Sequence, residues 1–224
     1  MSESSSITRI AYDTLRGDVL SCRLAPGTKI VIADICKERG FSPGAVREAL
    51  SRLTSEGLII AEPQKGFRVT PISREDLLDM TEVRANIEAQ CLRRAIELGD
   101  LAWEGRIIAI YHQLARTPER AAEDASRVND SWAKVHHQFH ATLVEACDSP
   151  WLLRIREMLY AQSERYRRLS VPLAHQTREL DREHHGIMQA VLARDPDQAS
   201  VLIGEHLRKT TDILLSSAVL QSSA

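Results

Sequence analysis

Apolar positions in the first part of the chain recur at helical spacing. Ile7, Ala11 and Leu15 follow one another every four residues, which is typical of the buried face of an amphipathic helix. After a turn, residues 32–39 form a second short helical run, which Gly40 ends. The pattern therefore predicts two helices before the chain reaches residue 41.

A third helix and two short strands follow. The third helix is expected to start at Ser42, a good N-cap, and to end at Gly57. Two segments, residues 58–63 and 67–72, then alternate apolar and polar side chains as the strands of a hairpin do. Three helices and a hairpin predict a winged helix-turn-helix domain over residues 7–72.

The rest of the chain has only helical patterns. From residue 73 onward no stretch shows the alternation of a strand, and glycine, proline and capping residues separate helical runs. These runs cover residues 74–98, 101–117, 126–147, 150–169, 176–194 and 196–216. The sequence therefore predicts a mainly α protein, with an all-α bundle of about six helices over residues 73–218.

The composition is that of a globular protein in water. Of the 224 residues, 43% are apolar and 27% are charged. No apolar run approaches the ~18 residues that span a bilayer, and the N-terminal segment lacks the basic-then-apolar order of a signal peptide. We therefore expect a cytoplasmic protein with no membrane partner. The four cysteines form no CxxC pair, so neither a zinc knuckle nor a disulfide framework is indicated.

Charge and histidine divide the chain at the same place. Residues 1–73 carry 10 Lys and Arg against 8 Asp and Glu, a net charge of +2, whereas the remaining 151 residues carry 19 against 23, a net charge of −4. All 8 histidines lie between His112 and His206. Two regions with different chemistry are therefore expected.

The front domain is suited to bind double-stranded DNA. In a helix-turn-helix unit the second helix enters the major groove, and residues near its N-terminus reach base edges. That helix begins here at Ser42. The expected DNA contacts are Ser42, Gly44, Arg47, Arg52, Lys65 and Gly66. The alternative is a solvated face on which Arg47 pairs with Glu48 or Glu56.

Four histidines share helix faces with apolar residues. His136 and His140 lie one turn apart on the apolar face of one helix, and His184 and His206 lie on the apolar faces of two others. A single buried histidine is most often satisfied by a backbone carbonyl. Four unpaired rings would cost ~1–3 kcal/mol each, whereas one shared metal satisfies them all. We therefore predict a divalent transition metal at these four residues, with zinc as first choice and nickel or another ion as alternatives.

The motifs of the front domain are specific. Residues 24–59 read LAPGTKIVIADICKERGFSPGAVREALSRLTSEGLI, and residues 65–69 read KGFRV. This combination of a PG turn, VREAL, EGL and a glycine-tipped wing resembles the N-terminal domain of the GntR superfamily of bacterial transcription regulators. That family often has Arg where this chain has Pro43, and Pro where it has Ala45. The resemblance therefore implies that Arg47 is the main base-reading residue.

The helical region carries a second set of motifs. They are EVRANIEAQC, FHATLVEACDSPWLL, EHHGI and GEHL. They resemble the FCD ligand-binding domain of the FadR-type branch of the same superfamily. Many members hold a metal with one Asp and three His, and the Asp stands four residues before the histidine of the FH pair. In this chain that position is His136.

A ligand for the metal is also expected. Four protein ligands can leave a position open on a five- or six-coordinate ion, and a small carboxylate effector could occupy it. Arg84 and Glu88 are the expected effector-binding residues, because a permanent charge at Arg84, on an apolar helix face, calls for an anion. The alternative is a salt bridge between the two. Arg165, Arg167 and Arg168 form either a cationic wall of this site or a solvated face, and the solvated face is expected for most of them.

These patterns lead to one interpretation with two alternatives. We interpret the chain as a homodimeric transcriptional regulator, a repressor rather than an enzyme. Its two recognition helices would bind a pseudo-palindromic operator, and a small organic acid would control its affinity for that operator. The alternatives are a metal-dependent hydrolase that uses the histidine cluster, and a DNA-binding protein whose bundle only dimerises. The HExxH motif of zinc hydrolases is absent from the sequence.

Overall fold

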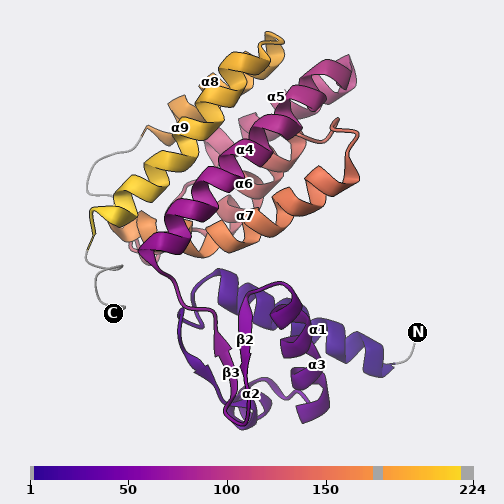
Figure 1. Ribbon diagram of the computed structural model, residues 1–224, viewed down its shortest axis with the longest axis vertical. Helices are drawn as coiled ribbons and strands as arrows, with labels where there is room; N and C mark the ends of the chain where they lie inside the picture. The colour runs from indigo at the N-terminus through magenta and orange to yellow at the C-terminus, as the bar shows by residue number, and fades with distance from the viewer. Residues whose placement is uncertain (1–2, 174–178, 218–224) are drawn as a thin grey trace. The chain divides into compact units, whose positions relative to one another are not determined.

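The chain consists of two compact units, Met1–Ser73 and Arg74–Ala224. A computed structural model describes residues 3–173 and 179–217 (Figure 1). The first unit contains α1 (Glu3–Leu20), β1 (Lys29–Ile30), α2 (Ile32–Arg39), α3 (Pro43–Ser55), β2 (Ile59–Glu62) and β3 (Gly66–Val69). Helices α1 and α3 pack together, and the three strands form an antiparallel sheet in the order β1-β3-β2. The predicted winged helix-turn-helix fold is confirmed.

Strand β1 is not expected from the sequence. It pairs Lys29 with Arg68 and Ile30 with Phe67, so the two-stranded hairpin becomes a three-stranded sheet. Two residues are too few to show a period of two, so only the tertiary structure reveals this strand. The pairing adds the buried side chain of Ile30 to the core beneath the sheet.

The second unit is helical in the described residues, apart from one isolated bridge. It contains α4 (Arg74–Leu98), α5 (Leu101–Arg116), α6 (Asp130–Leu143), α7 (Pro150–Ser170), the 3-10 turn η1 (Val171–Leu173), α8 (Leu180–Leu192) and α9 (Pro196–Leu215). The six-helix bundle is confirmed. The bridge joins Arg120 to Val128, although no strand signal was found in this region.

Two of the predicted helices are shorter than expected. The helix expected over 126–147 covers only Asp130–Leu143, because the side chain of Asn129 accepts a hydrogen bond from Ser131 N and starts it later. The helix expected over 176–194 is observed as Leu180–Leu192, and residues 176–178 lie outside the described residues.

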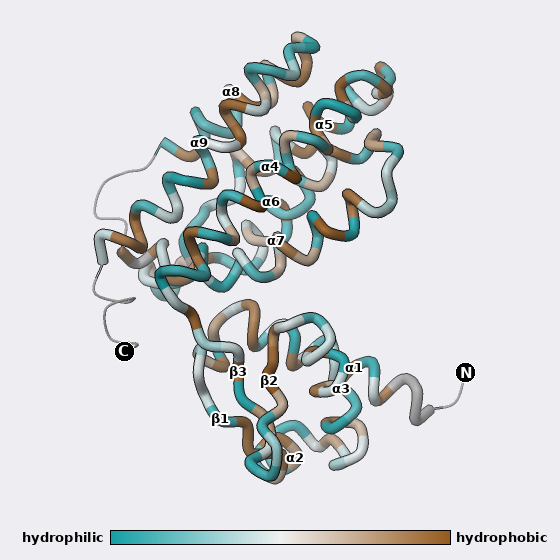
Figure 2. The backbone as a smooth tube through the Cα atoms, in the orientation of Figure 1, coloured by the Kyte–Doolittle hydropathy of each residue, from teal (hydrophilic) through white to brown (hydrophobic). Residues whose placement is uncertain are grey.

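The apolar faces of the helices of the second unit meet in one core. Figure 2 shows hydrophobic positions alternating with hydrophilic ones along each helix, as amphipathic helices require. Helices α4 and α9 lie side by side, and their one buried polar contact, among those described, joins the hydroxyls of Thr81 and Thr211 at 2.7 Å. Trp103, which is 1% exposed, fills the centre between α5 and α6 and donates from Nε1 to Thr142 O at 2.7 Å.

The expectations about the cysteines and about membrane-spanning helices can be compared with the structure. All four cysteines are free, and Cys91 and Cys147 are buried. Within the described residues no helix is both long enough and apolar enough to cross a bilayer.

The Trp103 packing generates a stability prediction. A Cβ at Gly99 would lie 2.0 Å from Trp103 Cε3, so Gly99→Ala must displace the buried indole. We expect it to lower the free energy of unfolding by ~1–3 kcal/mol, measured by chemical denaturation. The matched control is Gly105→Ala in the middle of α5, where nothing lies within 4 Å. There we expect an increase of ~0.5–1 kcal/mol. Equal effects of the two substitutions would contradict the packing of Trp103.

Candidate functional site

Three helices bring four histidines to one point inside the helical unit. Helix α6 carries His136 and His140 one turn apart, α8 carries His184 and α9 carries His206. Each residue is between 1% and 5% exposed, and one ring nitrogen of each lies within 4.8 Å of the others. The structure thus places together all four residues that the sequence singles out as metal ligands.

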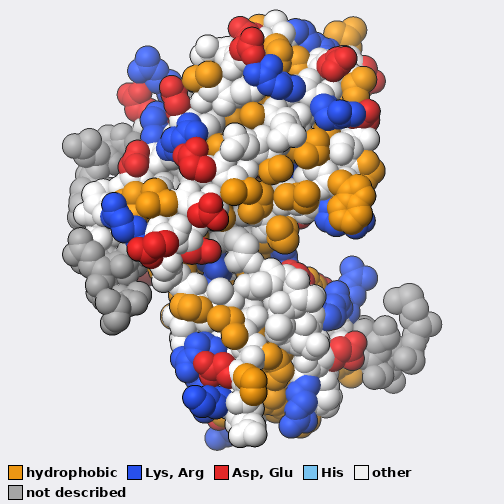
Figure 3. Space-filling model, viewed as in Figure 1, with side chains coloured by type: hydrophobic (Ala, Val, Ile, Leu, Met, Phe, Trp, Pro, Cys, Tyr) orange, Lys and Arg blue, Asp and Glu red, His pale blue; other side chains and the backbone are white. Residues whose placement is uncertain are grey.

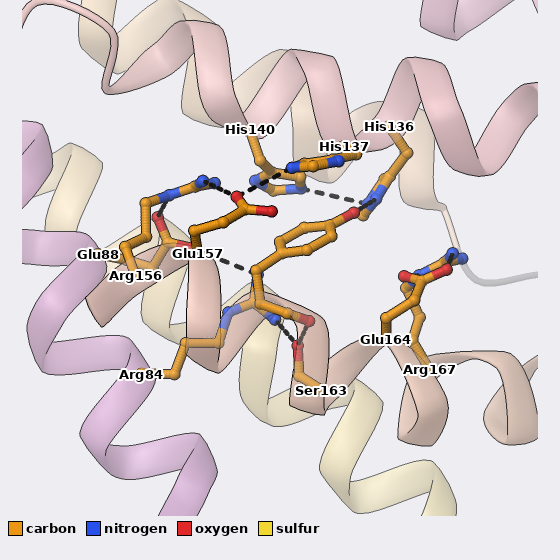
Figure 4. A network of polar contacts seen from close by, with 11 residues as sticks. Arg84, Glu88, His136, His137, His140, Arg156, Glu157, Ser163, Glu164 and Arg167 are labelled. Carbon is orange, nitrogen blue, oxygen red and sulfur yellow. Dashed lines mark hydrogen bonds and ion pairs between the residues drawn. The ribbon is translucent and has the colours of Figure 1, made fainter. Parts of the chain in front are cut away.

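The outer nitrogens of two of these rings have polar partners. His136 Nδ1 lies 3.3 Å from the Tyr160 hydroxyl, and His206 Nδ1 lies 2.8 Å from Glu183 Oε2. The Nε2 atoms of His136 and His140 face each other at 3.2 Å, as Figure 4 shows. His140 Nδ1 is buried without a hydrogen-bond partner in the described part of the chain. One ion bound between the four rings would give a partner to the ring nitrogens that face one another.

The electrostatics of the cluster favour neutral rings. Burial lowers the pKa of His136 and His140 well below the usual 6.5, and the neighbouring imidazoles lower each pKa further. Both rings are therefore neutral at pH 7, and neutral imidazole is the form that ligates a metal. Protons therefore compete with a metal for these two rings only at a pH below the usual histidine pKa.

The residues present fit a transition metal. In a tetrahedral site with Zn–N bonds of about 2.0–2.1 Å, the ligand nitrogens lie about 3.3–3.4 Å apart. The Nε2 atoms of His136 and His140 lie 3.2 Å apart, and one ring nitrogen of each of the four residues lies within 4.8 Å of the others, so the rings must draw closer together to share an ion. An all-imidazole set suits zinc, nickel, copper or iron and disfavours magnesium and calcium.

A small cavity of about 30 Å³ adjoins the cluster. Helices α4, α6, α7 and α9 contribute its walls, with Arg84, His136, Tyr160, Ser163, Arg167 and His206 among the lining residues. A volume of this size accommodates about two water molecules. Side chains must therefore move before an organic ligand can enter.

Arg84 lines this cavity, whereas Glu88 does not. The Arg84 guanidinium donates to Ser163 Oγ and to Glu88 Oε1, the latter at 3.3 Å, and Arg156 Nε donates to Glu88 Oε2 at 2.8 Å (Figure 4). The salt bridge considered as the alternative thus forms. Glu88 is held by two guanidinium groups away from the cavity, so it is not placed as an effector ligand or as the general base of a hydrolase.

The expectation of a solvated face for the arginines of α7 is wrong. Arg165 is 1% exposed, and the side chains of Arg167 and Arg168 are 13% and 14% exposed. Arg167 and Arg168 pair with Glu164 Oε1 at 2.6 and 2.9 Å. Helix α7 packs against both α4 and α9, which encloses this turn. Arg167 lines the cavity, as the alternative of a cationic wall requires.

Tyr160 is a lining residue that the sequence analysis missed. Its ring is 5% exposed, and the Arg84 guanidinium lies over it, 4.9 Å from its centroid. Burial raises the pKa of the Tyr160 hydroxyl, so the hydroxyl stays protonated and can donate to His136. The only sequence signal was helical: Arg156, Tyr160 and Arg167 share one face of α7.

The expected DNA-contacting residues of α3 lie on its exposed side. Ser42 caps the helix by accepting from Ala45 N at 3.2 Å, and Ser42, Gly44 and Arg47 are exposed. The pairing of Arg47 considered above is not observed among the described residues, since Glu56 instead contacts Tyr12 and Arg16.

The remaining expected DNA contacts lie at two further places. Arg52 is exposed but stacks on Tyr12, with its guanidinium carbon 3.9 Å from the ring centroid. Lys65 and Gly66 are exposed at the tip of the β2–β3 hairpin, where Gly66 has a φ of 95° that favours glycine.

Similar proteins support a regulatory role. Residues 8–69 match the gntR family of bacterial regulatory proteins, and residues 79–209 match the FCD domain. The HTH-type transcriptional regulator BphR of Paraburkholderia xenovorans (strain LB400) is 33% identical over 216 residues, which are 96% of this chain and 88% of that protein. The HTH-type transcriptional repressor GlaR of Escherichia coli (strain K12) is 34% identical over 200 residues, which are 88% and 90% of the two chains.

Solved structures share this fold. E. coli McbR/YncC superposes with a TM-score of 0.73 at 19% identity, covering 93% of this chain and 97% of that chain. A GntR regulator structure from Rhodococcus sp. RHA1 gives a TM-score of 0.72 at 20% identity, covering 95% and 99%. The chain therefore belongs to the GntR family of bacterial regulatory proteins, as a DNA-binding transcriptional regulator with an FCD domain.

Proposed function

We propose that this regulator is a repressor whose operator affinity is controlled by a small carboxylate, bound at a metal held by His136, His140, His184 and His206. The convergence of four buried imidazoles beside a lined cavity carries the proposal. Zinc is the first choice of metal, with nickel or another divalent transition ion as alternatives. When bound, the ion would supply a cationic centre that attracts an oxygen ligand.

The charge around the cavity favours an anionic effector. Of the acidic and basic side chains that line the cavity, Arg84 and Arg167 are cationic and Glu164 alone is anionic, which leaves one excess positive charge among them. Arg84 Nε and Arg167 Nη1 are buried without hydrogen-bond partners in the described residues. A carboxylate is the ligand that would satisfy both the charge and the open donors.

The DNA-binding half of the proposal rests on α3. Its exposed N-terminal residues Ser42, Gly44 and Arg47 would enter the major groove, with Arg52 and the hairpin tip at Lys65 and Gly66 beside it. We place this activity in the cytoplasm, where operator DNA is found. Effector binding and DNA binding would change each other's affinity by the same factor, as linkage requires.

We also propose that the protein acts as a homodimer on a pseudo-palindromic site. Figure 3 shows hydrophobic side chains gathered on the face over α4 and α7. Val83 of α4 is 42% exposed, and Trp151 and Met158, seven residues apart on α7, are 69% and 51% exposed. A second copy would remove this surface from water, and the two recognition helices would set the half-site spacing.

The metal assignment yields the first test of the proposal. We expect His140→Ala and His206→Ala each to abolish stoichiometric metal binding, measured by elemental analysis of dialysed protein, because each variant removes a ligand of the cluster. The matched control is His112→Ala, an exposed histidine on α5, which should retain the metal. Unchanged metal content in both cluster variants would reject the site.

Acidification tests the same ligands without substitution. Because ligating imidazoles must be neutral, protons compete with the metal once the pH falls below the histidine range. We expect full metal content at neutral pH and release at about pH 4. Retention at that pH would contradict ligation by histidine.

The effector is identified by a thermal-shift screen. Small mono- and dicarboxylates should raise the unfolding temperature of the metal-loaded protein, and a chelator should remove the effect, because the ligand binds only the folded, metal-loaded state. Arg84→Met should lose the response while it keeps the metal. The control, Arg116→Met, lies on the exposed side of α5 and should respond like the wild type. A response that survives both chelation and Arg84→Met would place the ligand elsewhere.

The recognition helix is tested with DNA selected by the wild type from a random library. Arg47→Ala should weaken binding to the selected sequence by ~1–3 kcal/mol, the worth of a bidentate base contact. Arg116→Ala removes the same charge from the helical unit and should leave binding unchanged. Undiminished binding by Arg47→Ala would move base recognition to other residues.

A further inference from the structure

His206 separates two hollows of the helical unit. On one side it lines the small inner cavity next to the histidine cluster. On the other side it lines a larger groove of about 610 Å³, formed by α8 and α9 together with the residue that precedes α8. The carboxylates of Glu179, Glu183 and Glu205 and the ammonium of Lys209 also line this groove.

One of these carboxylates is attached to the histidine. Glu183 Oε2 lies 2.8 Å from His206 Nδ1, and Glu183 Oε1 lies 3.3 Å from Lys209 Nζ. The Glu183 side chain is only 11% exposed, so water competes little for its oxygens, whereas the Lys209 side chain is 53% exposed. Helix α8 thus presents His184 to the cluster and, from the preceding residue, a carboxylate to α9.

The consequence follows from the chemistry of imidazole. When Nδ1 carries the proton and donates it to Glu183, Nε2 keeps its lone pair and is free to bind a metal. The same hydrogen bond stops rotation of the ring about its side-chain bonds. Outer carboxylates that orient histidine ligands in this way raise metal affinity by about 10–100-fold in known sites.

We propose that Glu183 is a positioning residue that fixes the tautomer and orientation of His206 for metal binding, while Lys209 restrains the second carboxylate oxygen. This inference rests on the proposed metal site. It assigns the effect to the hydrogen bond between His206 and Glu183. The negative charge of the groove, to which Glu205 also contributes, is not the cause.

Metal affinity and ligand field test this inference together. Apo protein is titrated with Zn²⁺ against a chromophoric chelator, and the visible spectrum of the Co²⁺ form is recorded. We expect Glu183→Leu to weaken Zn²⁺ binding about 10–100-fold and to change the Co²⁺ bands, because the His206 ring loses its orientation. Glu183→Gln keeps an acceptor oxygen at the same reach and should recover most of the affinity. Glu205→Gln removes a charge from the same groove and should behave like the wild type.

The outcomes separate this inference from the proposal beneath it. Wild-type affinity and an unchanged Co²⁺ spectrum in Glu183→Leu would overturn the role of Glu183 while leaving the metal site intact. Equal losses in Glu183→Gln and Glu205→Gln would assign the effect to groove charge and also overturn it. A wild type that binds no metal would overturn both.

Glu183 lines an open groove, so its removal leaves no closed core cavity. If Glu183→Leu still fails to fold, Glu183→Asp, which keeps the charge but withdraws the oxygen, should show the same loss.

Discussion

The helical unit is organised around four imidazoles buried at one point of an apolar core. Neutral rings can be buried there, yet a buried nitrogen without a hydrogen-bond partner, such as His140 Nδ1, costs ~1–3 kcal/mol of stability unless a ligand binds it. Aromatic neighbours fix the rings: Trp132 stacks on His136 with centroids 4.6 Å apart, and Phe139 meets His140 and His184 edge-on at 5.3 Å. Under the proposed function, rings fixed in this way would present their nitrogens to one shared ion.

The arginines around the cavity obey the same constraint. A buried guanidinium requires a carboxylate or another acceptor, and Glu88 and Glu164 supply one each for pairs of arginines on α4 and α7. Each carboxylate has only two oxygens, so some guanidinium donors face the cavity instead of a partner. Under the proposed function, the donors that remain open on Arg84 and Arg167 favour an anion in the cavity, beside nitrogens that favour a cation. A metal and a carboxylate would satisfy both needs together.

Much of this arrangement could be predicted from the sequence. The spacing of His136 and His140 puts both on the buried face of α6, and caps such as Ser42 and Asp195 mark helix starts that the structure shows. Strand β1 and the bridge between Arg120 and Val128 could not be predicted, because each is defined by its partner and not by a local pattern.

The rest of the site escaped sequence reasoning for a related reason. Tyr160 belongs to the site, and Arg167 lines it instead of a solvated face, because α4 and α9 cover this part of α7, and a helical period alone does not say which face a neighbour covers. Glu183 resembles any surface residue at a helix start until α9 places His206 against it. Inward-facing histidines could be found from periodicity, whereas the groups that orient them depend on how the helices pack.

Helix α4 extends from the first residue of the helical unit to the wall of the cavity. It starts at Arg74, the first residue of the helical unit, and it is one unbroken helix of 25 residues with Arg84 in its first half. The buried Thr81–Thr211 hydrogen bond joins this half of α4 to α9, which carries His206. Because interfaces between packed helices shift between discrete arrangements, an anion that draws Arg84 toward the cluster would act on α4 as a whole. Under the proposed function, the residue that recognises the effector and the start of the linker to DNA are therefore parts of one rigid element.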